Sequence, residues 1–170
     1  MARRLLLLPV ALFGALALIY YPQLPEPMAI HFGLHGEPNG FGSRAGFFGI
    51  GGGVMALLLL IFGGLGTLIR RLPVSLINIP HRTYWLAPER KDATIARLTG
   101  TMAIFGVFAL CYLDAVFYLA IQANLSKTPL SGTWLWPLLA SMGVAVIILV
   151  IRLLTLFRLP KGQKGSSVVR

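Results

Sequence analysis

Residues 47–69 read FFGIGGGVMALLLLIFGGLGTLI, a run of 23 residues without one ionisable side chain. About 20 apolar residues cross the roughly 30 Å of hydrocarbon in a bilayer as a helix, and only a helix satisfies its own backbone hydrogen bonds there. This run therefore predicts a membrane-spanning helix. Three other apolar runs predict further spans: residues 5–21, 98–123 and 135–157. The expected fold class is an all-α integral membrane protein, a bundle of four transmembrane helices.

The composition of the 170-residue chain agrees with a membrane protein. It is 56% hydrophobic and only 12% charged, with a mean hydropathy of +0.79, which is too apolar for an ordinary soluble domain. The net charge of +10 does not predict nucleic-acid binding, because the basic residues lie between and after the apolar runs. The lipid bilayer is the predicted partner. A disulfide framework is excluded within one chain, because Cys111 is the only cysteine.

The first apolar run can also be interpreted as a secretory signal. Arg3 and Arg4 precede it, and the tripeptide at residues 15–17, Ala-Leu-Ala, resembles a cleavage site. The run continues past this tripeptide to Tyr20 and Tyr21, which suit the interfacial layer of a membrane. A retained span is therefore favoured over cleavage.

The basic residues predict the orientation of the chain. Thirteen of the 15 Lys and Arg residues fall on one side of the expected spans, and only Arg44 and Lys127 fall on the other. Lys and Arg are retained on the cytoplasmic side during insertion. We therefore expect both termini and residues 70–97 in the cytoplasm. Residues 1–160 are expected to form one membrane domain, followed by a disordered tail at residues 161–170.

Residues 22–46 are predicted to form a compact cap on the outer side. Prolines at positions 22, 25 and 27 disfavour a helix and extend the chain. Met28, Ile30 and Phe32 then alternate with small or polar residues, a period of two that is typical of a strand. Positions 36–40 carry turn residues, since Gly and Asn tolerate positive φ and Pro presets a turn.

Two stretches of the chain resemble a known family. One is LPEPMAIHF at residues 24–32 with GEPNGFGS at residues 36–43, and the other is IPHRTYWLAPER at residues 79–90. They resemble a short stand-alone member of the bacterial domain of unknown function found in SdpI-type membrane proteins. The resemblance implies a protein of the bacterial plasma membrane that acts by recognition. The best-known relatives are immunity proteins against a secreted peptide toxin, and some also sequester a transcriptional repressor at the membrane.

His31 and His35, with Glu37 beside them, are the candidate ligand-binding residues of the expected cap. Imidazole and carboxylate groups bind divalent metals. However, a spacing of four aligns two imidazoles only on a helix, which Gly33 and Gly36 disfavour. No metal or other cofactor is therefore predicted. A structural role is favoured, in which His31 bonds backbone carbonyls of its own loop, with ligand contact or proton transfer as the alternative.

Asp114 is the carboxylate inside a predicted span, where an ionisable group is costly unless it faces protein, water or a partner. Helical spacing places it with Cys111, Tyr118 and Gln122 near one face. A packing role is favoured, in which Asp114 pairs with Arg44 or accepts hydrogen bonds from Tyr or Trp side chains. The alternative is a polar site beneath the cap, with Asp114 as base, cation ligand or proton carrier.

Glycines are frequent in the span at residues 47–69. Gly49 and Gly53 form a small-x-x-x-small pair, which allows another helix to approach closely. That helix belongs either to the same bundle or to another subunit, so homo-oligomerisation stays open. A phosphate-binding loop is not predicted, because no Lys-Ser or Lys-Thr follows the glycines.

The loop at residues 70–97 is predicted to lie on the inner membrane surface. Its aromatic side chains suit the headgroup layer. Docking of a cytoplasmic protein is the alternative interpretation. The residues that would make contact in either case are Arg82, Tyr84, Trp85, Glu89 and Arg90.

Two functional hypotheses follow. The first is a non-enzymatic membrane protein that recognises a protein or peptide, as an immunity, sensory or accessory factor. The second is a membrane-embedded enzyme or transporter with its site near His31, His35 and Asp114. The sequence shows no nucleophile–base pair and no complete metal motif, which favours the first hypothesis.

Overall fold

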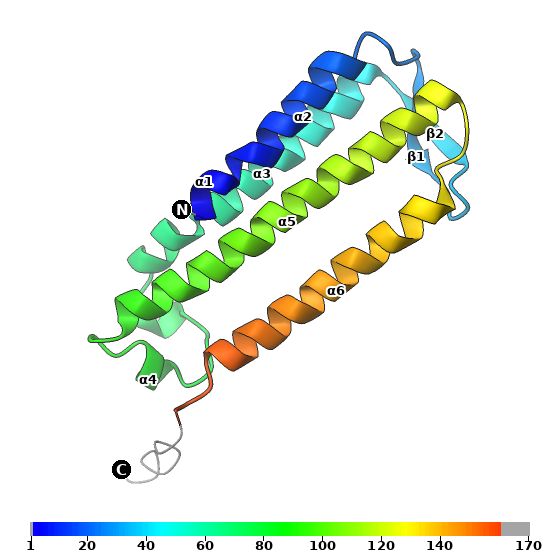
Figure 1. The fold of residues 1–170 in the computed structure, drawn as a ribbon. Coiled ribbons are helices and arrows are strands. Elements are labelled where there is room, and N and C mark those ends of the chain that lie inside the picture. Colours follow the sequence, from blue (N-terminus) through cyan, green and yellow to red (C-terminus); the bar gives the residue numbers. More distant parts are fainter. Residues whose placement is uncertain (1, 161–170) are drawn as a thin grey trace.

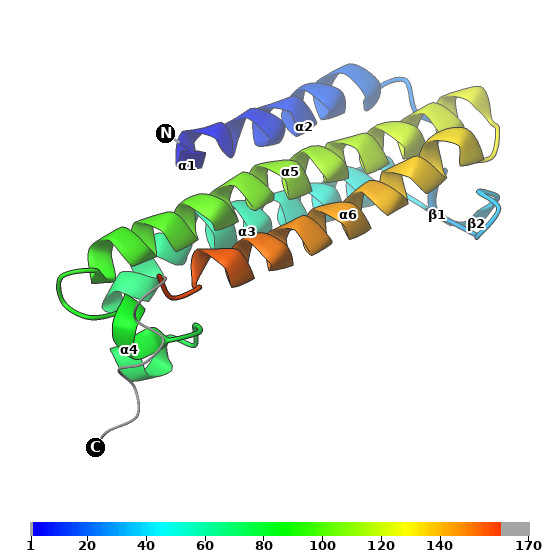
Figure 2. The same cartoon turned by 60° about the horizontal axis from the view of Figure 1, so that its bottom comes forward.

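The computed structural model describes residues 2–160 and is mostly helical (Figure 1). In chain order its elements are α1 (Ala2–Leu5), α2 (Leu7–Tyr20), β1 (Met28–Phe32), β2 (Pro38–Gly42), α3 (Arg44–Arg71), η1 (Val74–Leu76), α4 (Arg82–Trp85), α5 (Lys91–Ser126) and α6 (Gly132–Leu156). The hairpin of β1 and β2 lies at one end of the long helices and α4 lies at the other (Figure 1 and Figure 2). The expected tail at residues 161–170 lies outside the described part of the chain.

Three of the described helices, α3, α5 and α6, are long and apolar enough to cross a membrane. They contain 28, 36 and 25 residues, so at about 1.5 Å per residue each exceeds the roughly 30 Å hydrocarbon core. Both α3 and α5 extend beyond their predicted spans into more polar sequence. These three helices indicate a membrane protein.

The first predicted span is shorter than the others. Helix α2 has 14 residues, which is about 21 Å. Leu6, between α1 and α2, keeps helical backbone angles (φ −61°, ψ −23°). Pro9 has no N–H to donate to the carbonyl of Leu5, which explains the interruption in the hydrogen-bond pattern. Together α1 and α2 cover about 28 Å, and a fourth membrane crossing stays a prediction.

Helix α5 is the central element of the bundle. It packs against α2, α3 and α6, and α2 also packs against α3 (Figure 1). The main core lies between α2, α3 and α5, where the rings of Phe13 and Phe47 pack against Phe117 of α5 and against Phe48. Helix α6 differs from the other long helices, because it packs mainly against α5 and has no buried residue.

The glycines at which helices pack closely are not the predicted pair, Gly49 and Gly53. A Cβ atom built on Gly51 would lie 2.5 Å from Phe117 Cζ and 2.7 Å from Phe13 Cζ, and one on Gly106 would lie 2.5 Å from Phe62 Cγ. A Cβ built on Gly49 or Gly53 would meet nothing within 4 Å. The prediction that Gly49 and Gly53 pack within the bundle is therefore wrong. Their use against another subunit stays a prediction.

The strand predicted at Met28 to Phe32 is present as β1. It pairs antiparallel with β2, and the register aligns Met28 with Gly42 and Phe32 with Pro38. Between them lies a turn in which Gly36 has φ +83°, a value that residues with a Cβ atom rarely adopt. The structure therefore contains the expected extended segment and turn, while the position of the hairpin outside the membrane stays a prediction.

At the opposite end, the connection between α3 and α5 folds onto itself. Ile69, Ile77, Leu86 and Ile95 form a second small core there. The indole Nε1–H of Trp85 donates a hydrogen bond to the carbonyl of Phe157 (3.0 Å), just after the end of α6. This contact fixes the last turn of α6 to α4.

Candidate functional site: a cavity between the hairpin and helix α6

The hairpin is held on the end of α5 by Asn124. Its side-chain oxygen accepts a hydrogen bond from the backbone N–H of Ala29 (2.7 Å), and its NH2 group donates to the carbonyls of Ala29 (2.9 Å) and Ala120 (2.8 Å). Asn124 is 7% exposed and Ala29 is 5% exposed. One buried amide thus satisfies both backbone groups of a strand residue, which would otherwise be costly to bury.

A second contact joins the start of the hairpin to the start of α3. The carboxylate of Glu26 accepts hydrogen bonds from Nε–H (2.9 Å) and from the backbone N–H (3.1 Å) of Arg44. Arg44 also donates to the carbonyl of Tyr21 (3.2 Å). The hydrogen bonds from Arg44 lower the pKa of the Glu26 carboxyl below its usual value of 4.5. Charge-assisted bonds of this kind favour the ionised carboxylate.

A third contact joins the turn of the hairpin to the loop before α6. The backbone N–H of Leu130 donates to the carbonyl of Gly36 (2.8 Å). A Cβ atom on Gly36 would lie 2.4 Å from the carbonyl oxygen of Leu130. Glycine is thus required at this position by the close approach of the two backbones as well as by its positive φ.

These contacts leave a cavity of about 780 Å³ between the hairpin and the first turns of α6, which we call the hairpin cavity. Its polar lining comes from the hairpin, and its apolar lining comes mainly from the loop before α6 and from α6. The lining residues are His31, Phe32, Gly33, Leu34, His35, Glu37, Asn39, Leu130, Leu135, Trp136 and Leu139.

The hairpin cavity brings together three of the residues singled out from sequence, His31, His35 and Glu37. The Nδ1 atom of His31 is hydrogen-bonded to the side-chain oxygen of Asn39 on β2. The carboxylate of Glu37 accepts a hydrogen bond from the backbone N–H of His35 (3.0 Å). The expectation that His31 bonds backbone carbonyls of its own loop is therefore wrong, since its partner is an amide side chain across the hairpin.

The geometry of the cavity does not gather a metal-ligand set. Within residues 2–160, no group of three or more His, Cys, Asp or Glu side chains lies close enough to hold an ion. The arrangement instead presents imidazole, amide and indole groups along an open surface. Such groups suit hydrogen bonding and stacking with a bound segment.

Asp114 lies in the helix core and away from the hairpin. It is 3% exposed, and neither carboxyl oxygen has a hydrogen-bond partner among the described residues. It precedes Asn124 by ten residues, or about 15 Å of helix. The expected pairing of Asp114 with Arg44 is wrong, because Arg44 bonds Glu26 and Tyr21. An isolated carboxyl group inside a span is a feature that needs a functional explanation.

The residues predicted to share one helix face with Asp114 differ from it in exposure. Tyr118 is 43% exposed, and its ring stacks edge-on against Tyr20 of α2 with 6.3 Å between centroids. Cys111 is exposed as well. Asp114 is buried while Cys111 and Tyr118 are exposed, so these residues do not form one polar surface.

The residues predicted at the inner membrane surface make contacts within their own loop. The Arg90 guanidinium lies 4.1 Å from the centroid of the Tyr84 ring, and its Nε–H donates to the Tyr84 carbonyl (2.8 Å). Arg90 also pairs with Glu89 (2.9 Å), and Arg82 donates to the carbonyl of Ser75 (3.1 Å). These contacts stabilise the loop. Its role at a membrane interface or in docking stays a prediction.

Three important residues were not found from sequence. Asn39 and Trp136 line the hairpin cavity, and Asn124 anchors the hairpin. The sequence feature that could have drawn attention to Asn124 is its polar amide side chain just after the apolar run at residues 98–123. Its role depends on a strand 95 residues earlier in the chain, and no local pattern contains that information.

The Glu26–Arg44 pair predicts a pH dependence of the hairpin. Because the folded-state pKa of Glu26 lies below the usual 4.5, the pair contributes stability above about 4.5 and loses it as pH falls through the folded value. Wild-type protein should therefore lose protection of the hairpin against proteolysis in that acidic range. Glu26→Gln should show reduced protection at neutral pH and lack this acidic transition. An unchanged pH profile in Glu26→Gln would contradict this role.

Comparison with known proteins gives a partial match. The family described as "Domain of unknown function (DUF1648)" matches residues 6–52, which extend from the end of α1 through the hairpin into α3. An uncharacterized protein of Archaeoglobus fulgidus is 37% identical over 101 residues, covering 49% of this chain and 53% of that protein. The chain thus spans about half the length of this curated relative. No solved structure matches the chain. The structure and these matches describe a helical, membrane-type protein that contains a region similar to a domain of unknown function.

Proposed function

We propose that the chain is a multi-pass membrane protein that binds a peptide, or a segment of another protein, in the hairpin cavity without catalysing a reaction. In this role it acts as an immunity, sensory or accessory factor of a bacterial plasma membrane, with the hairpin outside and both termini inside. The observation that carries the proposal is the cavity of about 780 Å³ that His31, Asn39 and Trp136 line. Binding pockets commonly have such a volume and such a mixture of apolar walls and few polar groups.

The chemistry of the lining supports recognition of a peptide. Trp136 is 58% exposed and Leu34 is 79% exposed, so both offer large apolar surfaces to a ligand. Aromatic side chains of this kind dominate binding energy at protein interfaces. His31, Glu37 and Asn39 supply polar groups that can orient a backbone or a polar side chain. The resemblance to SdpI-type proteins also supports this proposal.

The hydrogen bonds of the cavity favour binding over catalysis. Among residues 2–160, no hydroxyl or thiol group is hydrogen-bonded to His31 or His35, and the partner of the His31 ring is Asn39. Nucleophilic catalysis requires a nucleophile within reach of a base. The three anchors of the hairpin instead supply a rigid surface, which reduces the entropy lost on binding.

A membrane-embedded transporter or enzyme that uses Asp114 is the second candidate. The observation in its favour is the burial of both carboxyl oxygens without a hydrogen-bond partner among the described residues. Ionisable residues inside spans commonly mark ion pathways or proton relays. This candidate predicts proton or cation flux into vesicles that contain the purified chain, and loss of that flux in Asp114→Asn.

The proposed function can be tested by photo-cross-linking in cells that carry the natural gene. A photoreactive amino acid at Leu34, in the hairpin cavity, is expected to form a discrete adduct with a peptide or protein. The matched control position is Ile147, which is 60% exposed on α6 and does not line the hairpin cavity. Trp136→Ala should strongly reduce the Leu34 adduct while leaving the amount of protein in the membrane unchanged.

Two results would contradict recognition at the cavity. One is the absence of a proteinaceous adduct at Leu34, and the other is the same adduct at Leu34 and Ile147. Flux that disappears in Asp114→Asn, combined with no adduct at Leu34, would establish the transport candidate in its place.

A further inference from the structure

Helix α6 is fixed at both ends and open along its middle. Before its first turn, Leu130 is bonded to Gly36 of the hairpin, and after its last turn the carbonyl of Phe157 is bonded to Trp85. Between these two contacts no residue of α6 is buried. Because both ends are held, the space between α5 and α6 is a fixed feature of the fold.

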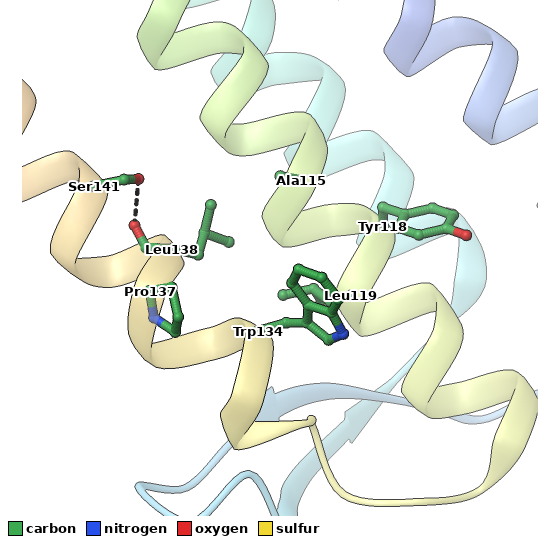
Figure 3. A pocket seen from close by; sticks show the side chains of 7 residues that line it. All are labelled: Ala115, Tyr118, Leu119, Trp134, Pro137, Leu138 and Ser141. Carbon is green, nitrogen blue, oxygen red and sulfur yellow. Dashed lines mark hydrogen bonds between the residues drawn. The ribbon is translucent and has the colours of Figure 1, made fainter.

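Two chambers occupy this space and meet at Ser141. The outer chamber, about 620 Å³, lies near the hairpin, where Trp134 and Leu138 of α6 point toward α5 (Figure 3). The inner chamber, about 550 Å³, continues toward the other end. The Ser141 hydroxyl donates to the carbonyl of Leu138 (2.6 Å) within its own helix (Figure 3). The Ser141 hydroxyl hydrogen is therefore already hydrogen-bonded at the point where the two chambers meet.

The inner chamber has apolar walls and a charged end. Phe105 and Phe108 of α5 face Val144 and Ile148 of α6, and Arg152 lies at the end farther from the hairpin. No carboxylate among the described residues pairs with Arg152, since their ion pairs join Arg44 with Glu26 and Arg90 with Glu89. An apolar groove that ends at an unpaired guanidinium is complementary to a molecule with an apolar chain and an anionic head.

We propose that the inner chamber binds an anionic phospholipid, with one acyl chain along the groove and the phosphate group at Arg152. Arginine binds phosphate oxygens through its planar set of donors. Basic pockets between membrane helices bind anionic lipid headgroups in this manner. The proposal depends on the membrane location of α5 and α6 and is independent of peptide binding at the hairpin cavity.

The length of the inner chamber suits one acyl chain and its headgroup. Eleven residues separate Ser141 from Arg152, or about 17 Å of helix. This distance corresponds to about half of the roughly 30 Å hydrocarbon core, which is the depth of one leaflet. The phosphate group of an anionic lipid would also supply the anionic partner that Arg152 lacks among the described residues.

The test uses the full-length chain purified in detergent and delipidated. Native mass spectrometry and thermal unfolding are measured with added phosphatidylglycerol, which is anionic, or phosphatidylcholine, which is zwitterionic. We expect about fivefold tighter binding of phosphatidylglycerol, the effect of one basic residue near an anionic headgroup. Arg152→Gln should abolish this preference and Arg152→Lys should retain it. Arg70→Gln is the matched control, because Arg70 lies in the last turn of α3, outside the chamber.

A second variant tests the position of the acyl chain. Ala145 lines the inner chamber, and Ala145→Trp should fill it and reduce binding of both lipids. If Ala145→Trp does not fold, the comparison of Arg152→Gln with Arg152→Lys still decides the proposal. Equal binding of the two lipids by wild-type protein, or a preference unchanged in Arg152→Gln, would overturn it. Stabilisation by protein dimerisation in place of lipid would assign the groove to a second copy.

Discussion

Replacing Asn124 by leucine is expected to detach the hairpin from the end of α5. The variant removes the partners of the Ala29 N–H and of the Ala29 carbonyl, which are bonded at 2.7 and 2.9 Å. Leucine has a similar size but cannot bond either group. A buried polar group left without a partner costs about 1–3 kcal/mol, and here two such groups are affected. Thermal unfolding and limited proteolysis of the hairpin in detergent should both show the loss.

The matched control for this prediction is Gln122→Leu. Gln122 lies two residues earlier on α5, is partly exposed, and its side chain makes no hydrogen bond to the described residues. Its replacement should change the stability by no more than about 0.5 kcal/mol. Asn124→Asp should have an intermediate effect, because it keeps the acceptor for the Ala29 N–H but lacks the donor. Equal stability of Asn124→Leu and Gln122→Leu would contradict the anchoring role.

Replacing Gly51 by leucine is expected to disrupt the core between α2, α3 and α5. Even a Cβ atom at this position would lie 2.5 Å from Phe117 Cζ and 2.7 Å from Phe13 Cζ. These two rings also pack edge-on against each other with 5.0 Å between centroids, so neither can move alone. Overpacking a dense core typically costs about 1–3 kcal/mol. The expected result is a lower unfolding temperature in detergent and a lower yield of monodisperse protein.

Gly49→Leu provides the control on the same helix. A Cβ at Gly49 would meet nothing within 4 Å, and leucine is a better helix former than glycine. Stability should therefore be unchanged or increased. If Gly49→Leu instead disrupts a complex in the membrane, the Gly49–Gly53 face contacts another subunit. Similar destabilisation by both variants in the isolated chain would contradict the packing of the core.

Local sequence patterns predicted the elements of this fold better than their contacts. The period of two at Met28, Ile30 and Phe32 predicted β1, because alternation is imposed by the strand itself. The apolar runs likewise predicted α3, α5 and α6. In contrast, the sequence did not show that Gly51 is packed and Gly49 is exposed. Which glycine faces the core depends on the rotation of the helix, and that rotation is set by the neighbouring helices. The first span was ambiguous from sequence, because residues 15–17 also resemble a cleavage site, and in the structure α2 has only 14 residues.

In the candidate site, too, local groupings of residues could be predicted from sequence and long-range contacts could not. His31, His35 and Glu37, which were singled out together from sequence, line one cavity because they are close in the chain and the turn between the strands is tight. Asp114 was linked to this group only by the helical spacing of polar residues, and the fold buries it outside the lining of the hairpin cavity. Trp136 was missed because its place in the cavity depends on the backbone contact between Leu130 and Gly36. Long-range contacts of this kind have no local sequence pattern.

The most direct test of the whole account is the accessibility of the two ends of the bundle in intact cells. Single cysteines are introduced at His35 in the hairpin and at Glu89 before α5, in a Cys111→Ser background. A membrane-impermeant maleimide should label the cysteine at position 35 in intact cells and the one at position 89 only after permeabilisation. Labelling of position 89 in intact cells, or equal labelling of both positions there, would contradict a membrane-spanning bundle with its hairpin outside.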